Sequence, residues 1–148
     1  MKPITVMVTA SGAPGTRALL RALKENGERE LRLVGTDMSE RSVGRHLCDA
    51  FQLVPAGSDP GFPDAVLELA RREGVDAILP QSSFDLEGLA EHVERFEMPV
   101  LVSGPETIRR SNDKAETYEL LHRLGLPAPQ FRRVNGGREV EAAALALG

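Results

Sequence analysis

Residues 4–15 read Ile4-Thr5-Val6-Met7-Val8-Thr9-Ala10-Ser11-Gly12-Ala13-Pro14-Gly15, an apolar and β-branched run that passes directly into a loop of small residues. Such a run is typical of a buried strand. The segment from Thr16 to Asn26 then spaces its leucines for one helical face, and Gly27 supplies a stop signal. Strand, glycine loop and helix in this order predict the opening unit of a parallel α/β sheet.

The same alternation continues through the chain. Further strands are predicted at Leu31–Thr36, Ala50–Val54, Ala77–Leu79 and Val100–Val102, and helices at Ser42–Leu47, Phe62–Ala70 and Leu86–Val93. We therefore expect an α/β fold, a Rossmann-like doubly wound parallel sheet with helices on both faces. A reversal of winding after the third strand gives the strand order 3-2-1-4-5.

This order makes the first and fourth strands neighbours. Open α/β sheets bind ligands in the crevice at the carboxyl ends of such strands. The loop Ala10–Gly15 and the segment Gln81–Asp85 follow these two strands, so both are expected to line one crevice.

The pattern changes after Pro105. A helix is predicted at Asn112–Leu124, a strand at Gln130–Val134 and a last helix at Glu139–Leu147. We expect residues 1–105 to form the Rossmann-like domain and residues 106–148 to be a connecting helix and the start of a second, α+β domain. The apolar stripe of the last helix has no strand after it to cover, which predicts that the chain is the first part of a longer protein.

Composition restricts the function classes. The chain has 148 residues, 41% hydrophobic and 27% charged, with a formal net charge of −4. No long basic tract or apolar span occurs, so neither nucleic acid nor a membrane is expected as the partner. Cys48 is the single cysteine, which excludes an internal disulfide and favours a cytoplasmic protein. The sequence gives no oligomeric state, and a homo-oligomer is compatible with it.

The glycine loop is an imperfect dinucleotide fingerprint. Gly12 and Gly15 match the second and third glycines of G-x-G-x-x-G, but Ala10 replaces the first. In that pattern, Gly12 lets backbone amides approach an anion and Gly15 lets the helix pack on the strand. The alternative is a tight strand-to-helix turn without a ligand.

Asp37 closes the second strand, where dinucleotide-binding folds hold a ribose hydroxyl. This position supports a nicotinamide-dependent oxidoreductase domain as a rival interpretation. Asp37 could instead cap the short helix that follows it.

Lys114 stands at a predicted helix start, because Asp113 and Glu116 have the spacing of a capping box. The helix dipole disfavours a cation there. Seven basic and three acidic residues lie between Arg109 and Arg138. A phosphate held near Lys114 would explain this placement, and a solvated lysine is the alternative. The three histidines, His46, His92 and His122, show no metal-ligand spacing, so no metal site is predicted.

Several segments in order resemble the ATP-grasp superfamily, and most closely the carbamoyl-phosphate synthase large subunit. The first two are Thr9–Gly15 and Val34–Asp37, which are similar to the amino-terminal, pre-ATP-grasp domain of these enzymes. Asp49–Pro55 and Gly74–Pro80 continue the resemblance. The last is Ser111-Asn112-Asp113-Lys114, followed by a Leu-Gly-Leu-Pro exit at residues 124–127.

The resemblance implies an ATP-dependent ligase that activates a carboxylate as an acyl phosphate, which an amine or thiol then captures. It implies ATP and Mg²⁺ as cofactors of the whole enzyme, with Lys114 touching ATP phosphates. The small-molecule carboxylate substrate would meet the loops after the first, second and fourth strands, at Ser11, Gly12, Gly15, Asp37, Gln81 and Ser82. No catalytic residue and no magnesium ligand is assigned within the chain. A non-catalytic small-molecule-binding domain stays open beside the oxidoreductase alternative.

Overall fold

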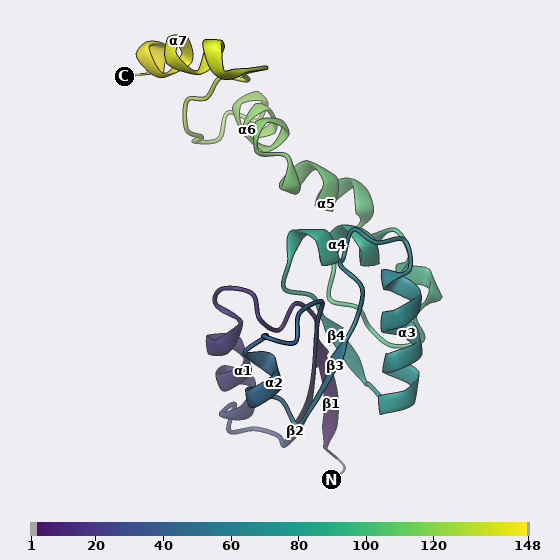
Figure 1. Ribbon diagram of the computed structural model, residues 1–148. Coiled ribbons are helices and arrows are strands. Elements are labelled where there is room, and N and C mark those ends of the chain that lie inside the picture. The colour runs from purple at the N-terminus through teal and green to yellow at the C-terminus, as the bar shows by residue number, and fades with distance from the viewer. Residues whose placement is uncertain (1–2, 148) are drawn as a thin grey trace. The chain divides into compact units, whose positions relative to one another are not determined.

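The computed structural model describes residues 3–147. Contacts divide the chain into two units, one that runs to Ile108 and one that starts at Arg109. The first unit is a four-stranded parallel sheet in the order β3-β2-β1-β4 (Figure 1). Its strands are β1 (Ile4–Val8), β2 (Leu31–Asp37), β3 (Ala50–Leu53) and β4 (Ala77–Leu79). The predicted doubly wound sheet is confirmed, with the first and fourth strands side by side.

The predicted fifth strand is reduced to one bridge. Val100 pairs in parallel with Ile78 of β4, at the edge expected for a fifth strand. The Ile78 amide donates to the Pro99 carbonyl at 2.9 Å, and the Leu101 amide donates to the Ile78 carbonyl at 2.9 Å. Gly104 and Pro105 follow directly, and Pro105 begins a helix, so the segment ends before a ladder can extend.

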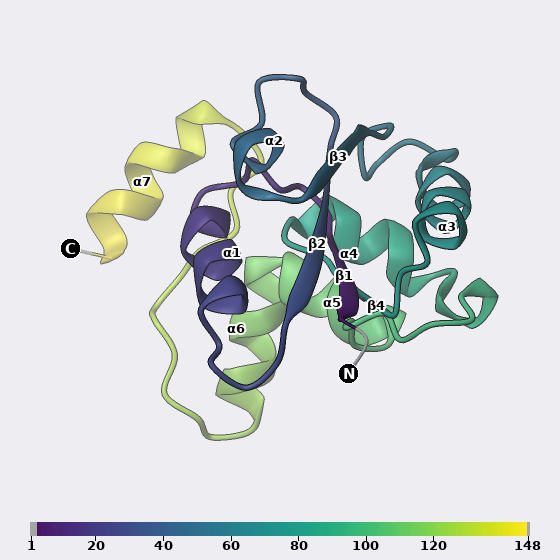
Figure 2. The ribbon, with the colours of Figure 1, turned by 90° about the horizontal axis from the view of Figure 1, so that it is seen from below.

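Helices cover both faces of the sheet (Figure 2). On one face lie α1 (Thr16–Lys24) and α2 (Gly44–Leu47), and on the other lie α3 (Phe62–Glu73) and α4 (Ser83–Ala90). Adjacent strand residues point to opposite faces. Val8 and Leu33 therefore pack with Leu20 of α1, whereas Met7 and Val34 join the cluster under α3 and α4.

The ends of α3 follow their sequence signals. Pro63 occupies the first turn, where its missing N–H costs nothing. Gly74 ends the helix in the left-handed conformation, and its N–H donates to the carbonyls of Ala70 and Arg71. The helix predicted to run to Val93 ends earlier, because α4 stops at Ala90 and Val93–Arg95 forms a separate 3₁₀ turn.

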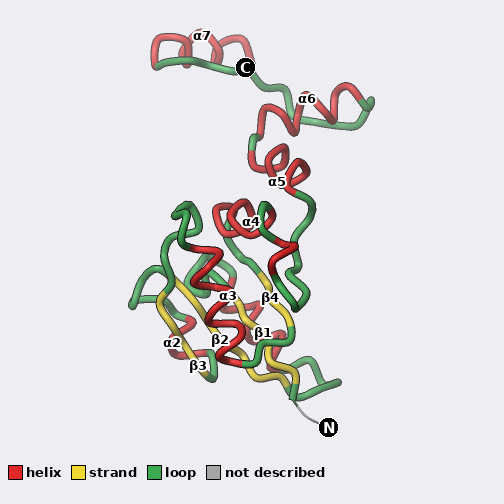
Figure 3. The backbone as a smooth tube through the Cα atoms, turned by 90° about the vertical axis from the view of Figure 1, so that its right-hand side faces the viewer, coloured by secondary structure: helices red, strands yellow, loops and turns green. Residues whose placement is uncertain are grey.

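The carboxyl-terminal part of the chain is helical (Figure 3). The helix predicted at Asn112–Leu124 is confirmed as α6 (Lys114–Arg123), and a helix that was not predicted, α5 (Pro105–Asn112), precedes it, with Asp113 between the two. Asp113 caps α6 with its side chain, which accepts a hydrogen bond from the Glu116 amide at 3.0 Å. The predicted placement of Lys114 in the first turn is confirmed.

The strand predicted at Gln130–Val134 is wrong. No strand occurs among the described residues after Ala77–Leu79, so this segment has no ladder to join. Phe131 packs instead on α6, with its ring centroid 5.4 Å from that of Tyr118 and 6.2 Å from that of His122. The last helix, α7 (Gly137–Leu147), leaves Val140 and Leu147 exposed. Within residues 3–147, no helix is long and apolar enough to cross a membrane.

Candidate functional site

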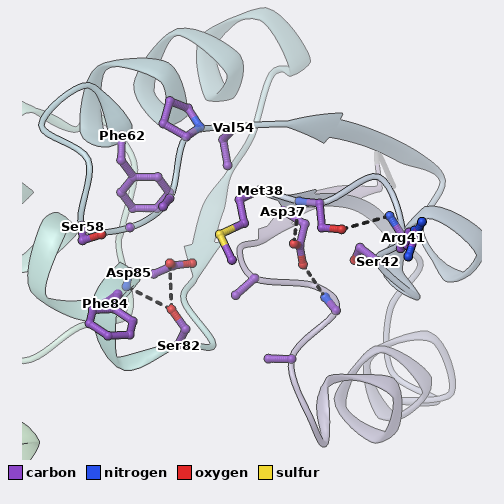
Figure 4. Close-up of a pocket in the computed structure, with 17 residues that line it drawn as sticks. Asp37, Met38, Arg41, Ser42, Val54, Ser58, Phe62, Ser82, Phe84 and Asp85 are labelled. Atoms are coloured by element: carbon purple, nitrogen blue, oxygen red, sulfur yellow. Dashed lines mark hydrogen bonds between the residues drawn. The ribbon is translucent and has the colours of Figure 1, made fainter.

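A cavity of about 460 Å³ opens at the carboxyl ends of the strands in the first unit. Its wall includes Ala10, Gly12 and Ala13 from the loop after β1, and Ser82, Phe84 and Asp85 from the start of α4. The structure thus brings together the two loops that the strand order predicts at one crevice. The loop after β2 and residues 54–58 after β3 complete the wall (Figure 4).

Asp37 organises one side of this cavity. Its Oδ2 accepts a hydrogen bond from the Gly12 amide at 2.8 Å, and its Oδ1 accepts one from the Ser39 amide at 3.0 Å. The side chain therefore ties the end of β2 to the glycine loop. Asp37 does not cap α2. The N-cap residue of that helix is Val43, and no side chain caps the helix with a hydrogen bond.

The glycine loop differs from the expected phosphate cradle. A Cβ on Gly12 would lie 2.9 Å from Asp37 Oδ2 and 2.8 Å from Ser42 Oγ, so the protein itself fills the space that was expected for an anion. Gly15 has a φ of +88° and open space beside it, so the backbone conformation and not helix packing calls for glycine. Both sequence-based reasons for these glycines are corrected.

Ser11 lies beneath the cavity and does not line it. The residue is fully buried, and its Oγ lies 3.2 Å from Ser42 Oγ. A Cβ on Gly44 would meet Ser11 Oγ at 2.0 Å, so α2 rests directly on this side chain. The position predicted to touch substrate therefore joins α2 to the loop after β1.

In the segment after β4, one predicted site residue lines the cavity and the other does not. Gln81 turns back, donating from Nε2 to the Pro80 carbonyl at 2.8 Å, and does not line the cavity. Ser82 does line it and caps α4, because its Oγ accepts from the Asp85 amide at 3.1 Å. The same hydroxyl donates to Asp85 Oδ1 at 2.7 Å.

Asp85 is a buried charged residue of the site that sequence reasoning placed in the lining segment Gln81–Asp85 but did not single out. It is 5% exposed and faces the cavity. Burial raises the pKa of this carboxyl, and the negative charge of Asp37 raises the pKa further, although the neighbouring Thr9 and Ser82 hydroxyls oppose the rise. The Ser-x-x-Asp spacing at the start of a helix was the available signal.

Apolar side chains form much of the remaining wall. Phe62 is buried, whereas Met38 and Phe84 are 71% and 64% exposed. Exposed large apolar groups around a cavity are typical of a ligand site. Their sequence positions carry no motif, so they could not be predicted individually.

Lys114 and its neighbours from Arg109 onward belong to the second unit. Lys114 is exposed at the first position of α6, and no ion pair with another described residue involves it. Arg109 instead pairs with Glu116 at 2.6 Å. The backbone N–H of Glu116 lowers the pKa of Asp113, and the charges of Arg133 and Arg109 lower the pKa further.

Cys48 lies in the first unit and is not a candidate for nucleophilic chemistry. Burial raises the pKa of the Cys48 thiol to about 11, so the group is neutral at physiological pH and is a poor nucleophile. Among residues 3–147, no three His, Cys, Asp or Glu side chains are grouped so that they could hold a metal ion.

Comparison with known proteins identifies the fold. Residues 6–102 match the family described as PylC-like, N-terminal domain. A carbamoyl phosphate synthase large chain from Rubrobacter xylanophilus is 29% identical over 141 residues, which cover 90% of this chain and 13% of that protein. A carbamoyl-phosphate synthase from Methanobrevibacter smithii is 28% identical over 116 residues, which cover 74% of this chain and 29% of that protein. The chain thus spans less than a third of the length of either relative.

Solved structures agree on the fold. N5-carboxyaminoimidazole synthetase from Staphylococcus aureus, complexed with ADP, is 17% identical, with a TM-score of 0.69 over 99% of this chain and 36% of that chain. A biotin carboxylase domain of a thermophilic 2-oxoglutarate carboxylase is 19% identical, with a TM-score of 0.60 over 97% of this chain and 33% of that one. The family match covers most of the sheet and the cavity, and it confirms the resemblance that the motifs indicated. The chain belongs to the PylC-like N-terminal domain family.

Proposed function

We propose that the chain is the amino-terminal portion of an ATP-dependent ligase that joins a carboxylate to an amine or thiol through an acyl phosphate. The observation that carries this proposal is the cavity at the carboxyl ends of β1 and β4 in a chain of this family. The similarity to carbamoyl phosphate synthase large chains over 90% of the sequence supports it. In this proposal, residues 1–105 form the substrate-facing domain, and residues 106–148 lead into the nucleotide-binding one.

One residue of the chain, Lys114, is suited to contact ATP. Lys114 is an exposed cation at a helix start, and its charge is not used by an ion pair among the described residues. When bound, ATP would supply the phosphoryl group that activates the carboxylate, and Mg²⁺ would neutralise the phosphates. Lys114 would hold a phosphate oxygen by a charged hydrogen bond. The described residues hold no cluster for Mg²⁺, so its ligands would come from elsewhere in the enzyme.

The oxidoreductase alternative is not favoured. Its phosphate site would use the Gly12 amide, but that amide already donates to Asp37. The ribose-binding carboxylate would be Asp37, which here holds the backbone amides of Gly12 and Ser39.

Titration calorimetry with ATP tests the proposal. One charged contact is worth about 1.5–3 kcal/mol, whereas millimolar affinity requires about 4 kcal/mol. The 148-residue chain is therefore expected to bind ATP no better than millimolar. The longer ligase is expected to bind ATP more tightly and to release ADP only when a carboxylate is present.

Two substitutions in the longer protein localise the contact. Lys114→Ala is expected to weaken ATP binding about tenfold or more. Arg123→Ala, at the other end of α6, removes an exposed cation and is the matched control. Unchanged ATP affinity in Lys114→Ala would remove Lys114 from the site, and ATP-independent activity would refute the ligase proposal.

A further inference from the structure

The charged side chains that line the cavity are Asp37, Arg41 and Asp85. Asp37 keeps its charge but is held locally, because each of its carboxylate oxygens accepts a hydrogen bond from a backbone N–H. Arg41 is an exposed residue of the wall and forms no ion pair with another described residue. The deeply buried charge is that of Asp85, which is 5% exposed.

Asp85 lacks the partner that a buried carboxylate ordinarily has. Buried carboxylates are normally paired with a cation, because removing their charge from water is costly. The groups that stabilise the Asp85 carboxylate are neutral, the Ser82 hydroxyl, which donates a hydrogen bond, and the neighbouring Thr9 hydroxyl. No ion pair among the described residues includes Asp85. Figure 4 shows one carboxylate oxygen bonded to Ser82 and the other directed toward the Met38 side of the cavity.

The backbone holds this carboxylate in place. A Cβ on Gly57 would lie 2.5 Å from Asp85 Oδ1 and 2.6 Å from the Asp85 amide, so the loop after β3 is packed directly against the start of α4. A Cβ on Gly88 would in turn lie 2.6 Å from the Gly57 carbonyl. The loop after β3 therefore packs against this carboxylate, which leaves the cavity as the side from which a ligand cation can reach it.

The walls around Asp85 indicate what carries that counter-charge. Phe62, Phe84 and Met38 line the cavity with aromatic and thioether groups. A hydrated metal ion takes several oxygen ligands, which one buried carboxylate does not supply. An organic ammonium needs one carboxylate and gains further from aromatic faces and apolar walls.

We propose that this cavity binds a small molecule through a primary ammonium group on a short aliphatic chain, with the ammonium paired to Asp85. The inference rests on the proposed function in taking the cavity as a substrate site. It reverses the orientation of the substrate that the sequence analysis expected. The loops after β1, β2 and β4 then face the amine-bearing end of a substrate and not its acid or acyl phosphate.

The raised pKa of Asp85 agrees with this assignment. The other charged groups that line the cavity are Asp37 and Arg41, and burial together with Asp37 disfavours the ionised form of Asp85. An ammonium ion favours the ionised form. Binding is therefore expected to weaken as the pH falls and Asp85 takes up a proton.

The test uses three probes of equal chain length with the 148-residue chain. Butylamine carries only the ammonium, butyrate only the carboxylate, and 4-aminobutyrate both. Backbone amide NMR spectra are recorded during titration with each probe. Butylamine and 4-aminobutyrate are expected to give saturable shifts at residues 82–85 and 56–58, whereas butyrate is not.

Asp85→Asn keeps the side-chain shape and is expected to weaken butylamine binding about tenfold or more. Glu87→Gln makes the same charge change on the exposed side of α4, outside the cavity, and is expected to leave binding unchanged. Equal shifts with butyrate and butylamine, or full binding by Asp85→Asn, would overturn the inference. No probe involves ATP, so failure here leaves the ligase proposal to its own test with the longer protein.

Discussion

The backbone amide of Gly12 donates a hydrogen bond to Oδ2 of Asp37 at 2.8 Å, which joins the loop after β1 to the end of β2. The same carboxylate accepts the Ser39 amide at 3.0 Å. An internal carboxylate thus occupies an amide that a phosphate-binding loop of this shape would offer to its ligand. The loop is a preformed wall of the cavity and not a phosphate cradle at this position.

Asp37→Ala is expected to destabilise the first unit, because it removes the acceptor from two backbone amides. A hydrogen bond to a charged group contributes about 1.5–3 kcal/mol, and these two are partly exposed, so we expect a loss of about 2 kcal/mol in the free energy of unfolding. Asp37→Asn keeps one acceptor oxygen and should lose less. Urea unfolding of both variants checks this order, and equal stability of wild type and Asp37→Ala would contradict it.

Gly12→Ala and Gly15→Ala are expected to act by different physical routes. The Gly12 Cβ would meet Asp37 Oδ2 at 2.9 Å and the Ser42 Cα at 3.1 Å, so Gly12→Ala should displace the Asp37 contact. Gly15→Ala has free space but a φ of +88°, which costs roughly 1–2 kcal/mol for a residue with a Cβ.

Gly15→Asn separates these routes, because asparagine tolerates the left-handed region better than alanine. It should be more stable than Gly15→Ala in thermal melts, whereas Gly12→Asn should be no better than Gly12→Ala. The opposite ranking at Gly15 would show that packing and not backbone conformation selects glycine there.

Ala10 takes the place of the first fingerprint glycine, yet it adopts a φ of +44°. An alanine in the left-handed region is strained by roughly 1–2 kcal/mol. We therefore expect Ala10→Gly to raise the free energy of unfolding. Ala18→Gly, at an exposed position of α1, should lower it by about 1 kcal/mol. Chemical denaturation of Ala10→Gly and Ala18→Gly measures the sign of the change in the free energy of unfolding for each variant. Destabilisation by Ala10→Gly would show that the substitution does not release the backbone strain at residue 10.

The hydrophobic pattern predicted the sheet because the central strands β1 and β2 are buried on both faces, and because α1 and α3 each have one apolar stripe. Met7 and Val8 show the first point, since they are both fully buried yet belong to clusters on opposite faces. The strand predictions failed where strand formation depends on pairing with a neighbouring strand. Val100 bridges only Ile78, and the strand-like segment at Gln130–Val134 has no neighbouring strand among the described residues.

The location of the candidate site could be predicted from the sequence, whereas the contacts of its individual side chains could not. Strand order alone brings Gly12 and Ser82 to one cavity. Sequence could not reveal that Asp37 would turn toward the Gly12 amide, nor that Ser11 would be fully buried beneath α2. Asp85 was expected in a segment that lines the crevice, but its burial was not predicted, because it depends on the close approach of Gly57, a residue far from it in sequence.

Asp85 should make stability depend on pH in a defined direction. Burial raises its pKa in the folded state above the unfolded value, which is about 3.9. Its favourable contribution is therefore complete below that unfolded pKa and is lost as the pH rises through the folded pKa. Asp85→Asn does not titrate and keeps an oxygen that can accept the Ser82 hydroxyl. The melting temperature of Asp85→Asn minus that of the wild type should thus increase from pH 4 to pH 7. Thermal melts at pH 4, 5.5 and 7 make the comparison. A difference for Asp85→Asn that shrinks with rising pH would mean that the ionised carboxylate stabilises the fold, and that the cavity already satisfies its charge without a ligand.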